Sequence, residues 1–381
     1  MNISISSLEK KHFPVMLDEV IKICDPVKNH KTFLDCTFGQ GGYTEKILEN
    51  SNNKVIAFDR DINAIKLSEK YKIHFKNRFE FNHKKFSEIK NIDSKEIKAI
   101  IFDLGYSTDQ IFDDEKGLSF NFKGKLNMKM GLNSFSAHDV VNKLDKEELS
   151  KIFKYFGDEK DARKISQAII NKRNQNFLST EDLVKIINKI KKNYNFKINK
   201  STKIFQSLRI FVNQEISELI YGLINAYKLL PLGSYIIVVT FHSLEDKIVK
   251  FFFKNYSEDK KVSRYLPGLK NTEIFFELLN KKAITPSTEE LKKNPASRSA
   301  KLRYVKKIIV KNRTINNFIT NILSDGYNAV FKTLSDGKVP VVLGGDHTVA
   351  ISSVFASNDY CNLCNKKLGV VWCDAHADFN T

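Results

Sequence analysis

The chain has 381 residues, of which 42% are hydrophobic, so it is long enough for two or three domains with cores of their own. Lysine and arginine number 62 against 44 aspartates and glutamates, a formal net charge of +18 that favours an anionic partner, nucleic acid first. A composition merely biased towards lysine, asparagine and isoleucine would give the same excess. Five uneven cysteines exclude a disulfide framework. With no signal-peptide core and no run that could span a membrane, we expect a cytoplasmic protein without membrane contact.

The first hundred residues alternate between two kinds of pattern. Short apolar runs predict strands, and a helical pattern over 62–71 separates the second from the third. The predicted strands cover 32–35, 54–59, 79–82 and 97–104. Strands that alternate with helices are typical of a parallel sheet in an α/β fold.

A glycine-rich turn after the first strand is the most informative feature. The strand ends at Asp35, and Gly39, Gly41 and Gly42 follow in a G-x-G-G pattern, not the G-x-G-x-x-G that presents amides to a pyrophosphate. A carboxylate here repels phosphate but suits a cation, and S-adenosylmethionine carries an ammonium and a sulfonium. Asp59, at the tip of the second strand, can accept both ribose hydroxyls. The pattern favours a class I methyltransferase pocket over a plain strand–turn–helix connection.

The pattern becomes helical after Asp113. Acids after Ser179 mark a helix start, and no sheet-type strand interrupts the block. The helical stretches cover 139–156, 162–172 and 180–192. We therefore predict an all-helical insertion over 114–203, inside a sheet domain formed by 1–113 and 204–312.

The sheet pattern returns after this insertion. A long amphipathic stretch over 204–230 stops at Pro231 and Gly233. A nearly continuous apolar run over 234–241 then predicts a buried parallel strand, directly followed by His242.

Two stretches contain no acidic residue, 183–214 and 291–324. Tyr194 and Phe196 lie among the lysines of the first. The basic residues include Lys185, Lys189, Lys191, Lys192, Lys197, Lys200, Lys203 and Arg209 in the first, and Arg298, Lys301, Arg303, Lys306 and Lys307 in the second. Cations contact phosphates and aromatic rings stack on unpaired bases, so these stretches favour RNA binding.

Seven ordered motifs carry a family resemblance. They are HFPVMLDE at 12–19, DCTFGQGG at 35–42, DRD at 59–61, DLG at 103–105 with Gln110, FQSLRI at 205–210, FHSLED at 241–246, and Asn294-Pro295 with RSAKLR at 298–303. Residues from about 12 to 310 thereby resemble the small-subunit ribosomal RNA (cytosine-N4)-methyltransferases of the RsmH/MraW type. The resemblance implies a Rossmann-like class I S-adenosylmethionine-dependent fold with an inserted helical domain.

The resemblance also implies a reaction and a cofactor pocket. Family members transfer a methyl group from S-adenosylmethionine to the exocyclic amine of a cytosine in the decoding centre, so the implied partner is small-subunit ribosomal RNA or the 30S subunit. Whether the substrate is naked RNA or the subunit, and the oligomeric state, stay open. The implied cofactor-binding residues are Gly41, Gly42, Tyr43, Asp59, Phe86, Asp103 and Gln110. Phe86 would lie beside the adenine, or it is a core aromatic.

Two residues are candidates for the chemistry. The N4 lone pair of cytosine is delocalised into the ring, and an acceptor for an N4 hydrogen would raise its electron density. Asp103, at the tip of the fourth strand, is our candidate to position the amine, the cofactor or both, against the alternative of an acid that caps the next turn. His242 contacts the RNA or the active site, or is a structural histidine bonded to Glu245 or Asp246.

Several positions depart from the family pattern. Tyr43 stands in place of histidine, and Tyr106-Ser107-Thr108 in place of Val-Ser-Ser. Asn127 and Lys129 replace the acid and arginine of LDMRM, and Asn199 to Lys203 replace HPATR. These changes concern substrate contacts more than cofactor binding. A catalytically decayed RNA-binding homologue is therefore an alternative function.

The last part of the chain resembles a different family. After a junction over 313–326, residues 327–381 carry PVVLGGDHT at 340–348 and a closing segment with Asp374-x-His376-x-Asp378, both similar to the arginase/agmatinase family. His347, Asp374, His376 and Asp378 would be ligands of a two-manganese site in that family. The chain stops before two further aspartates that the family needs, so we expect an incomplete α/β fragment, a gene fusion or truncated reading frame, without ureohydrolase activity. A lone CxxC at Cys361 and Cys364 is a weak zinc motif.

Overall fold

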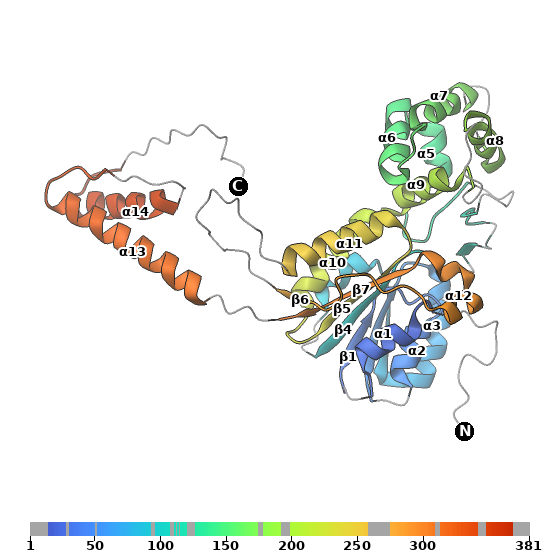
Figure 1. Ribbon diagram of the computed structural model, residues 1–381, viewed down its shortest axis with the longest axis horizontal. Coiled ribbons are helices and arrows are strands. Elements are labelled where there is room, and N and C mark those ends of the chain that lie inside the picture. The colour runs from blue at the N-terminus through green and yellow to red at the C-terminus, as the bar shows by residue number, and fades with distance from the viewer. Residues whose placement is uncertain are drawn as a thin grey trace. The chain divides into compact units, whose positions relative to one another are not determined.

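Figure 1 shows the computed structural model of the chain. It describes residues 14–27, 30–49, 52–92, 96–106, 110–111, 113, 115–119, 126–173, 178–191, 199–257, 275–308, 313–341 and 348–368. The chain divides into two compact units, each treated by itself: Met1–Glu258 with Ile274–Ile309, and Asp259–Glu273 with Val310–Thr381.

The first unit is built on a seven-stranded sheet in the order β3-β2-β1-β4-β5-β7-β6, counted over the described residues. Only β7 runs antiparallel to its neighbours, β5 and β6. The strands are β1 (Thr32–Asp35), β2 (Lys54–Asp59), β3 (Phe79–His83), β4 (Ile97–Asp103), β5 (Tyr235–Thr240), β6 (Phe276–Leu278) and β7 (Lys301–Lys307). The parallel sheet expected from the apolar runs is confirmed, whereas β6 and β7 had no distinct apolar signal.

Helices cover both faces of the sheet, because successive side chains of a strand point to opposite faces. In β4, Ile101 packs under α1 (Leu17–Cys24), α2 (Gly42–Leu48) and α3 (Ile62–Phe75). Its neighbour Phe102 packs on the other face under α10 (Glu215–Leu229) and α11 (Ser243–Ser257). This double burial explains why the central strands are continuous apolar runs.

Five helices form a block with its own core, and we call them the helical block: α5 (Ala137–Lys143), α6 (Lys146–Gly157), α7 (Ala162–Arg173), α8 (Thr180–Ile190) and α9 (Thr202–Asn213). The stretch 139–156, predicted as one helical element, is two helices. Leu144 ends α5 in an extended conformation, and the side chain of Asp145 caps α6 by accepting from the Glu148 N–H at 2.8 Å. The N-cap at Asp145 therefore starts a new helix, although the helical periodicity of the sequence continues through this position.

The amphipathic stretch 204–230 is also divided. Gln214 adopts a left-handed conformation with φ 53° and separates α9 from α10. Leu208 of α9 is buried in the core of the helical block, whereas Leu223 of α10 is buried against the sheet. By packing, the helical block therefore reaches Asn213 and does not end at the expected boundary of 203.

The second unit contains two described helices, α13 (Arg313–Ser335) and α14 (Thr348–Leu363), which pack on each other. The Tyr327 hydroxyl donates to Asp359 at 2.8 Å, and the Phe331 ring stacks on Tyr327 with 5.8 Å between centroids. The residues expected to form a junction, 313–326, lie within α13. Most of the segments expected as strands, at 342–347 and 369–381, lie outside the described residues.

No helix in the described part of the chain combines the length and apolar character needed to cross a membrane.

Candidate active site

A cavity of about 880 Å³ opens at the carboxyl ends of the parallel strands, within the first unit. Residues that follow β1, β2, β4 and β5 line it, and Met130, Phe205 and Arg209 close it from the side of the helical block. Carboxyl ends of parallel strands are where open α/β sheets bind ligands. This volume suits a nucleoside-sized cofactor together with part of a second ligand.

The glycine turn forms one wall of the cavity. Gly39 has φ +51° and donates its N–H to Asp59 Oδ2 at 2.7 Å. Gly42 lies beside Pro14, whose Cγ would be 2.0 Å from an added Cβ. Gly41 has φ +77° and packs on the Tyr71 ring, and it is absent from the cavity lining. Two of the three glycines are thus required by protein packing, besides any approach of a ligand.

Asp59 and Asp61 form the next wall, after β2. Asp59 accepts backbone N–H groups from Gly39 and Asp61, yet burial raises its pKa. Asp61 caps α3 and also accepts from Gln110 Nε2 at 2.5 Å and from Lys116. Burial would raise the pKa of Asp61, but the bonds from Lys116 and Gln110 outweigh it and lower the pKa. Asp61 was in the sequence motif without an assigned role, and it ties Gln110 to this wall.

Asp103 ends β4 inside the cavity. Its backbone N–H donates to Thr37 Oγ1 at 2.7 Å, and its side-chain Oδ1 is buried without a hydrogen-bond partner among the described residues. Burial, followed by the charge of Asp35, raises its pKa well above the ordinary range. The buried Tyr43 ring lies beside Asp103 and donates its hydroxyl to the Val15 carbonyl. An unpaired carboxylate oxygen in a cavity is suited to an incoming N–H donor or cation.

Asp35 lies fully buried behind the cavity wall, where Thr44 Oγ1 donates to it at 2.7 Å. Burial raises its pKa from 3.8 to about 6, against the opposing bond from Thr44. The folded chain therefore holds a proton that the unfolded chain has lost between about pH 4 and pH 6. This side chain destabilises the fold as pH rises through that window, and its effect is constant above it.

Replacing Asp35 with Asn should flatten this part of the pH dependence. Relative to wild type, we expect the variant to gain about 3 kcal/mol of unfolding free energy between pH 4 and pH 7, the equivalent of the raised pKa. Urea unfolding at four pH values measures it. Glu80→Gln, an exposed acid on β3, is the control. If the difference in unfolding free energy between wild type and Asp35→Asn does not change with pH, the raised pKa of Asp35 is contradicted.

Phe86 lies in η3 (Phe86–Asn91) with features of both expected roles. Its ring packs edge-on against Phe102 with 5.5 Å between centroids and lies against Gly222 of α10. It also lines the cavity. The ring therefore belongs partly to the core while one part remains available to a ligand.

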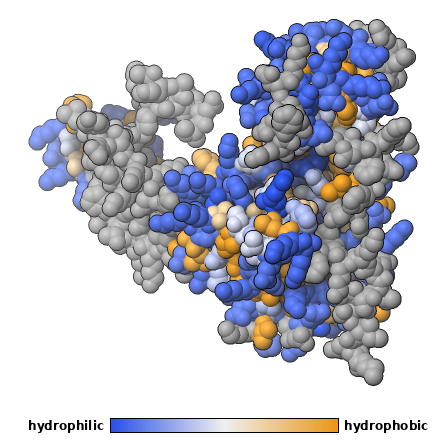
Figure 2. Space-filling view, turned by 45° about the vertical axis from the view of Figure 1, so that its right-hand side comes forward, coloured by the Kyte–Doolittle hydropathy of each residue, from blue (hydrophilic) through white to orange (hydrophobic). Residues whose placement is uncertain are grey.

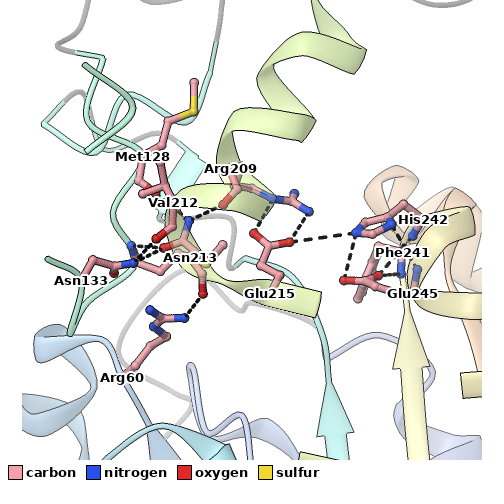
Figure 3. Close-up of polar contacts among 11 residues, drawn as sticks. Arg60, Met128, Asn133, Arg209, Val212, Asn213, Glu215, Phe241, His242 and Glu245 are labelled. Carbon is pink, nitrogen blue, oxygen red and sulfur yellow. Dashed lines mark hydrogen bonds and ion pairs between the residues drawn. The ribbon is translucent and has the colours of Figure 1, made fainter. Parts of the chain in front are cut away.

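His242 follows β5 and lies between two carboxylates, as Figure 3 shows. Its Nδ1 accepts the Glu245 N–H at 3.3 Å, and its Nε2 lies 3.1 Å from Glu245 Oε1 and 4.0 Å from Glu215 Oε2. Burial alone would lower the pKa of His242, but the two carboxylates outweigh it and raise the pKa. The contact with Glu245 is the one expected of a structural histidine, and the residue also lines the cavity. Arg209 binds both oxygens of Glu215. The cluster of Glu215, His242 and Glu245 is therefore already neutralised in part by a guanidinium cation.

A polar network joins the helical block to the loop after β2, and sequence reasoning missed it. Arg60 donates to the Gly131 carbonyl at 2.8 Å and to the Asn213 carbonyl at 2.9 Å. The Asn213 side chain accepts from the Met130 N–H and donates to the Met128 carbonyl (Figure 3). Backbone groups of residues 128–131 make most of these bonds. The departures from LDMRM therefore do not remove the contacts that hold this segment in place. The departure at Asn127 adds a bond of its own, to the Glu115 carbonyl at 3.0 Å.

The candidate metal residues of the C-terminal part, His347, Asp374, His376 and Asp378, lie outside the described residues. Cys361 and Cys364 are described, and both are free thiols.

The sheet order, with one antiparallel strand beside β5, and the cavity at its carboxyl edge, with Asp59 and Asp103 at the strand tips, are those of a class I S-adenosylmethionine-dependent methyltransferase. A family model confirms the class: the chain belongs to the MraW methylase family, which matches residues 9–308. The arginase family model matches residues 282–381, so the second resemblance is confirmed as well and overlaps the end of the first.

Curated relatives cover the same part of the chain. A ribosomal RNA small subunit methyltransferase H from Ehrlichia canis is 41% identical over 304 residues, which is 78% of this chain and all of the relative. The protein of the same name from Rickettsia prowazekii is 38% identical over 308 residues, 79% of this chain and all of the relative. Among solved structures, an rRNA methylase from Streptococcus thermophilus is 10% identical, with 79% and 99% of the chains covered and a TM-score of 0.36, too low to support a conclusion.

Proposed function

We propose that the chain methylates the exocyclic N4 amine of a cytosine in the decoding centre of small-subunit ribosomal RNA. Family membership and the names of the relatives support the small-subunit RNA as substrate. The observation that carries the choice of an amine is Asp103, whose buried Oδ1 lacks a partner at the end of β4. An amine hydrogen is a donor for such an oxygen, whereas a ring carbon offers none.

The cavity fits S-adenosylmethionine, which supplies a methyl group on a positively charged sulfur. Asp59, Asp61 and Asp103 line it at and beside the strand ends, and carboxylates there suit a cation better than a phosphate. We assign Asp59 to the ribose hydroxyls and Phe86 to the adenine. Tyr43, Gly42 and Gln110 complete the proposed cofactor side. Gly41 supports the turn from behind, since it does not line the cavity.

In this proposal Asp103 acts on the substrate amine. With a hydrogen of N4 held by Oδ1, the nitrogen lone pair is turned towards the methyl group, and electron density returns from the ring. The nitrogen–carbon bond would form as the methyl–sulfur bond breaks to leave a neutral thioether, and Asp103 would take the proton that N4 must lose. Orientation of the two reactants then supplies most of the rate. The ionised carboxylate is the stronger acceptor, whereas burial and the charge of Asp35 raise the pKa of Asp103. We therefore propose that a bound cation completes the site by lowering that pKa.

The helical block is the proposed RNA-binding part. Its stretch 183–214 contains no acidic residue, but acids from other parts of the block pair with its lysines. Lys185 pairs with Glu181 and Lys191 with Glu159, each at 2.7 Å. On the face shown in Figure 2, hydrophilic residues cover most of the helical block, as a polar partner requires. RNA contact then depends on the overall positive charge more than on one uninterrupted lysine face. Such a substrate would place the enzyme in the cytoplasm.

Transfer of a labelled methyl group to ribosomal particles tests the substrate. We expect the full chain to label small-subunit particles that lack the modification, and to leave large-subunit particles from the same cells unlabelled. Naked small-subunit RNA in parallel shows whether assembly is required. Equal labelling of both subunits, or none of the small subunit, would contradict the proposal.

A further inference from the structure

Tyr106 is a large aromatic residue that lines the cavity and stays 43% exposed. It follows Asp103 by three residues, just beyond the end of β4. Gly105 between them has φ +110°, a conformation that lets the chain turn sharply after the strand. A core ring would be covered by other side chains, so this ring is not part of the core.

Arg209 holds the Tyr106 ring from one side. Its guanidinium carbon lies 4.7 Å from the ring centroid, a cation–π contact. Two hydrogen bonds of 2.8 and 2.9 Å fix the same guanidinium on Glu215, and both side chains of this pair are only 11% exposed. Arg209 presents Nε and Nη2 to Glu215, so its charge is largely neutralised by this buried carboxylate. Arg209 therefore supports the ring, and the exposed part of Tyr106 stays open to a ligand.

We propose that Tyr106 stacks on the target cytosine while Asp103 accepts a hydrogen from its amine. This inference rests on the proposed function. A base that an enzyme modifies must leave its own stack, and an aromatic side chain replaces the lost stacking. Stacking is tolerant of base identity, because every base has a flat π-face. Tyr106 would thus supply position and affinity, and Asp103 the recognition of the amine.

Kinetics on small-subunit particles separate a stacking ring from a merely structural one. We expect Tyr106→Ala to lower kcat/KM by about 5- to 150-fold, the equivalent of about 1–3 kcal/mol per stacked base. Tyr106→Phe keeps the ring and should retain the wild-type value, and neither variant should change the affinity for S-adenosylmethionine. Tyr221→Ala, an exposed tyrosine on α10 away from the cavity, is the matched control. A Tyr106→Ala enzyme as fast as wild type would overturn the stacking.

A binding signal independent of turnover completes the test. The chain has one tryptophan, Trp372, so Trp372→Phe with Tyr106→Trp places a single indole at the proposed contact. We expect small-subunit RNA to quench its fluorescence, and RNA that is abasic at the target cytosine to quench it less. Equal quenching by both RNAs overturns the stacking while the proposed function stands. A wild-type enzyme that forms no N4-methylcytosine overturns the function, and the stacking with it.

Discussion

Asp103→Ala should slow methyl transfer severely without unfolding the protein. We expect a loss of about 10²- to 10³-fold in the transfer rate, the scale seen when one preorganised polar group is removed from an active site. The thermal midpoint should not fall, because the wild-type carboxylate has one buried oxygen, Oδ1, that is unpaired among the described residues. Single-turnover transfer to small-subunit particles and thermal unfolding measure the two effects.

Asp103→Asn distinguishes the expected roles of this residue. The amide keeps an acceptor oxygen and loses the charge, so it should transfer faster than the alanine variant if Asp103 mainly accepts from the amine. Glu80→Gln again serves as the control for charge removal from the sheet. Near-normal turnover of Asp103→Ala would show that the acid only supports the turn after β4.

Gly131→Ala should lower the free energy of unfolding strongly, and more than Gly233→Ala does. Gly131 has φ +124°, and a Cβ on it would lie 1.9 Å from the Arg60 carbonyl oxygen. Strain of the backbone alone costs about 1–3 kcal/mol, and displacing the loop after β2 adds to it, so we expect at least about 3 kcal/mol in all. Urea unfolding measures the loss.

Gly233→Ala is the matched control, because Gly233 has φ +80° with nothing within 4 Å of an added Cβ. It should show the backbone strain without the clash. If Gly131→Ala costs no more than Gly233→Ala, the close approach to Arg60 is not a constraint on the fold. A larger loss should also weaken cofactor binding, since Arg60 lies between Asp59 and Asp61 on the cavity wall.

The sheet could be predicted because its signals are local. The buried strands β1, β2, β4 and β5 are apolar runs ended by polar residues, and burial on both faces makes such runs unmistakable. Asp59 and Asp103 are the last residues of β2 and β4, so predicting these strands also predicted that both acids lie at one edge of the sheet.

The rest depends on contacts between residues far apart in the chain. The roles of Asn213 and Arg60 arise from bonds to backbone carbonyls across 85 and 153 positions, and no periodicity encodes them. The break at Gln214 carries neither glycine nor proline, so the amphipathic pattern continued through it. The pairing of Lys191 with Glu159 likewise cannot be found in a stretch considered alone.

The identity of the methylated nucleoside decides whether the acceptor is an exocyclic amine. Small-subunit particles lacking the modification are incubated with the full chain and labelled S-adenosylmethionine, and the RNA is digested for mass spectrometry. We expect label in N4-methylcytosine at a single position of the decoding centre. Label in 5-methylcytosine, or in any nucleoside without a methylated exocyclic amine, would contradict the role proposed for Asp103.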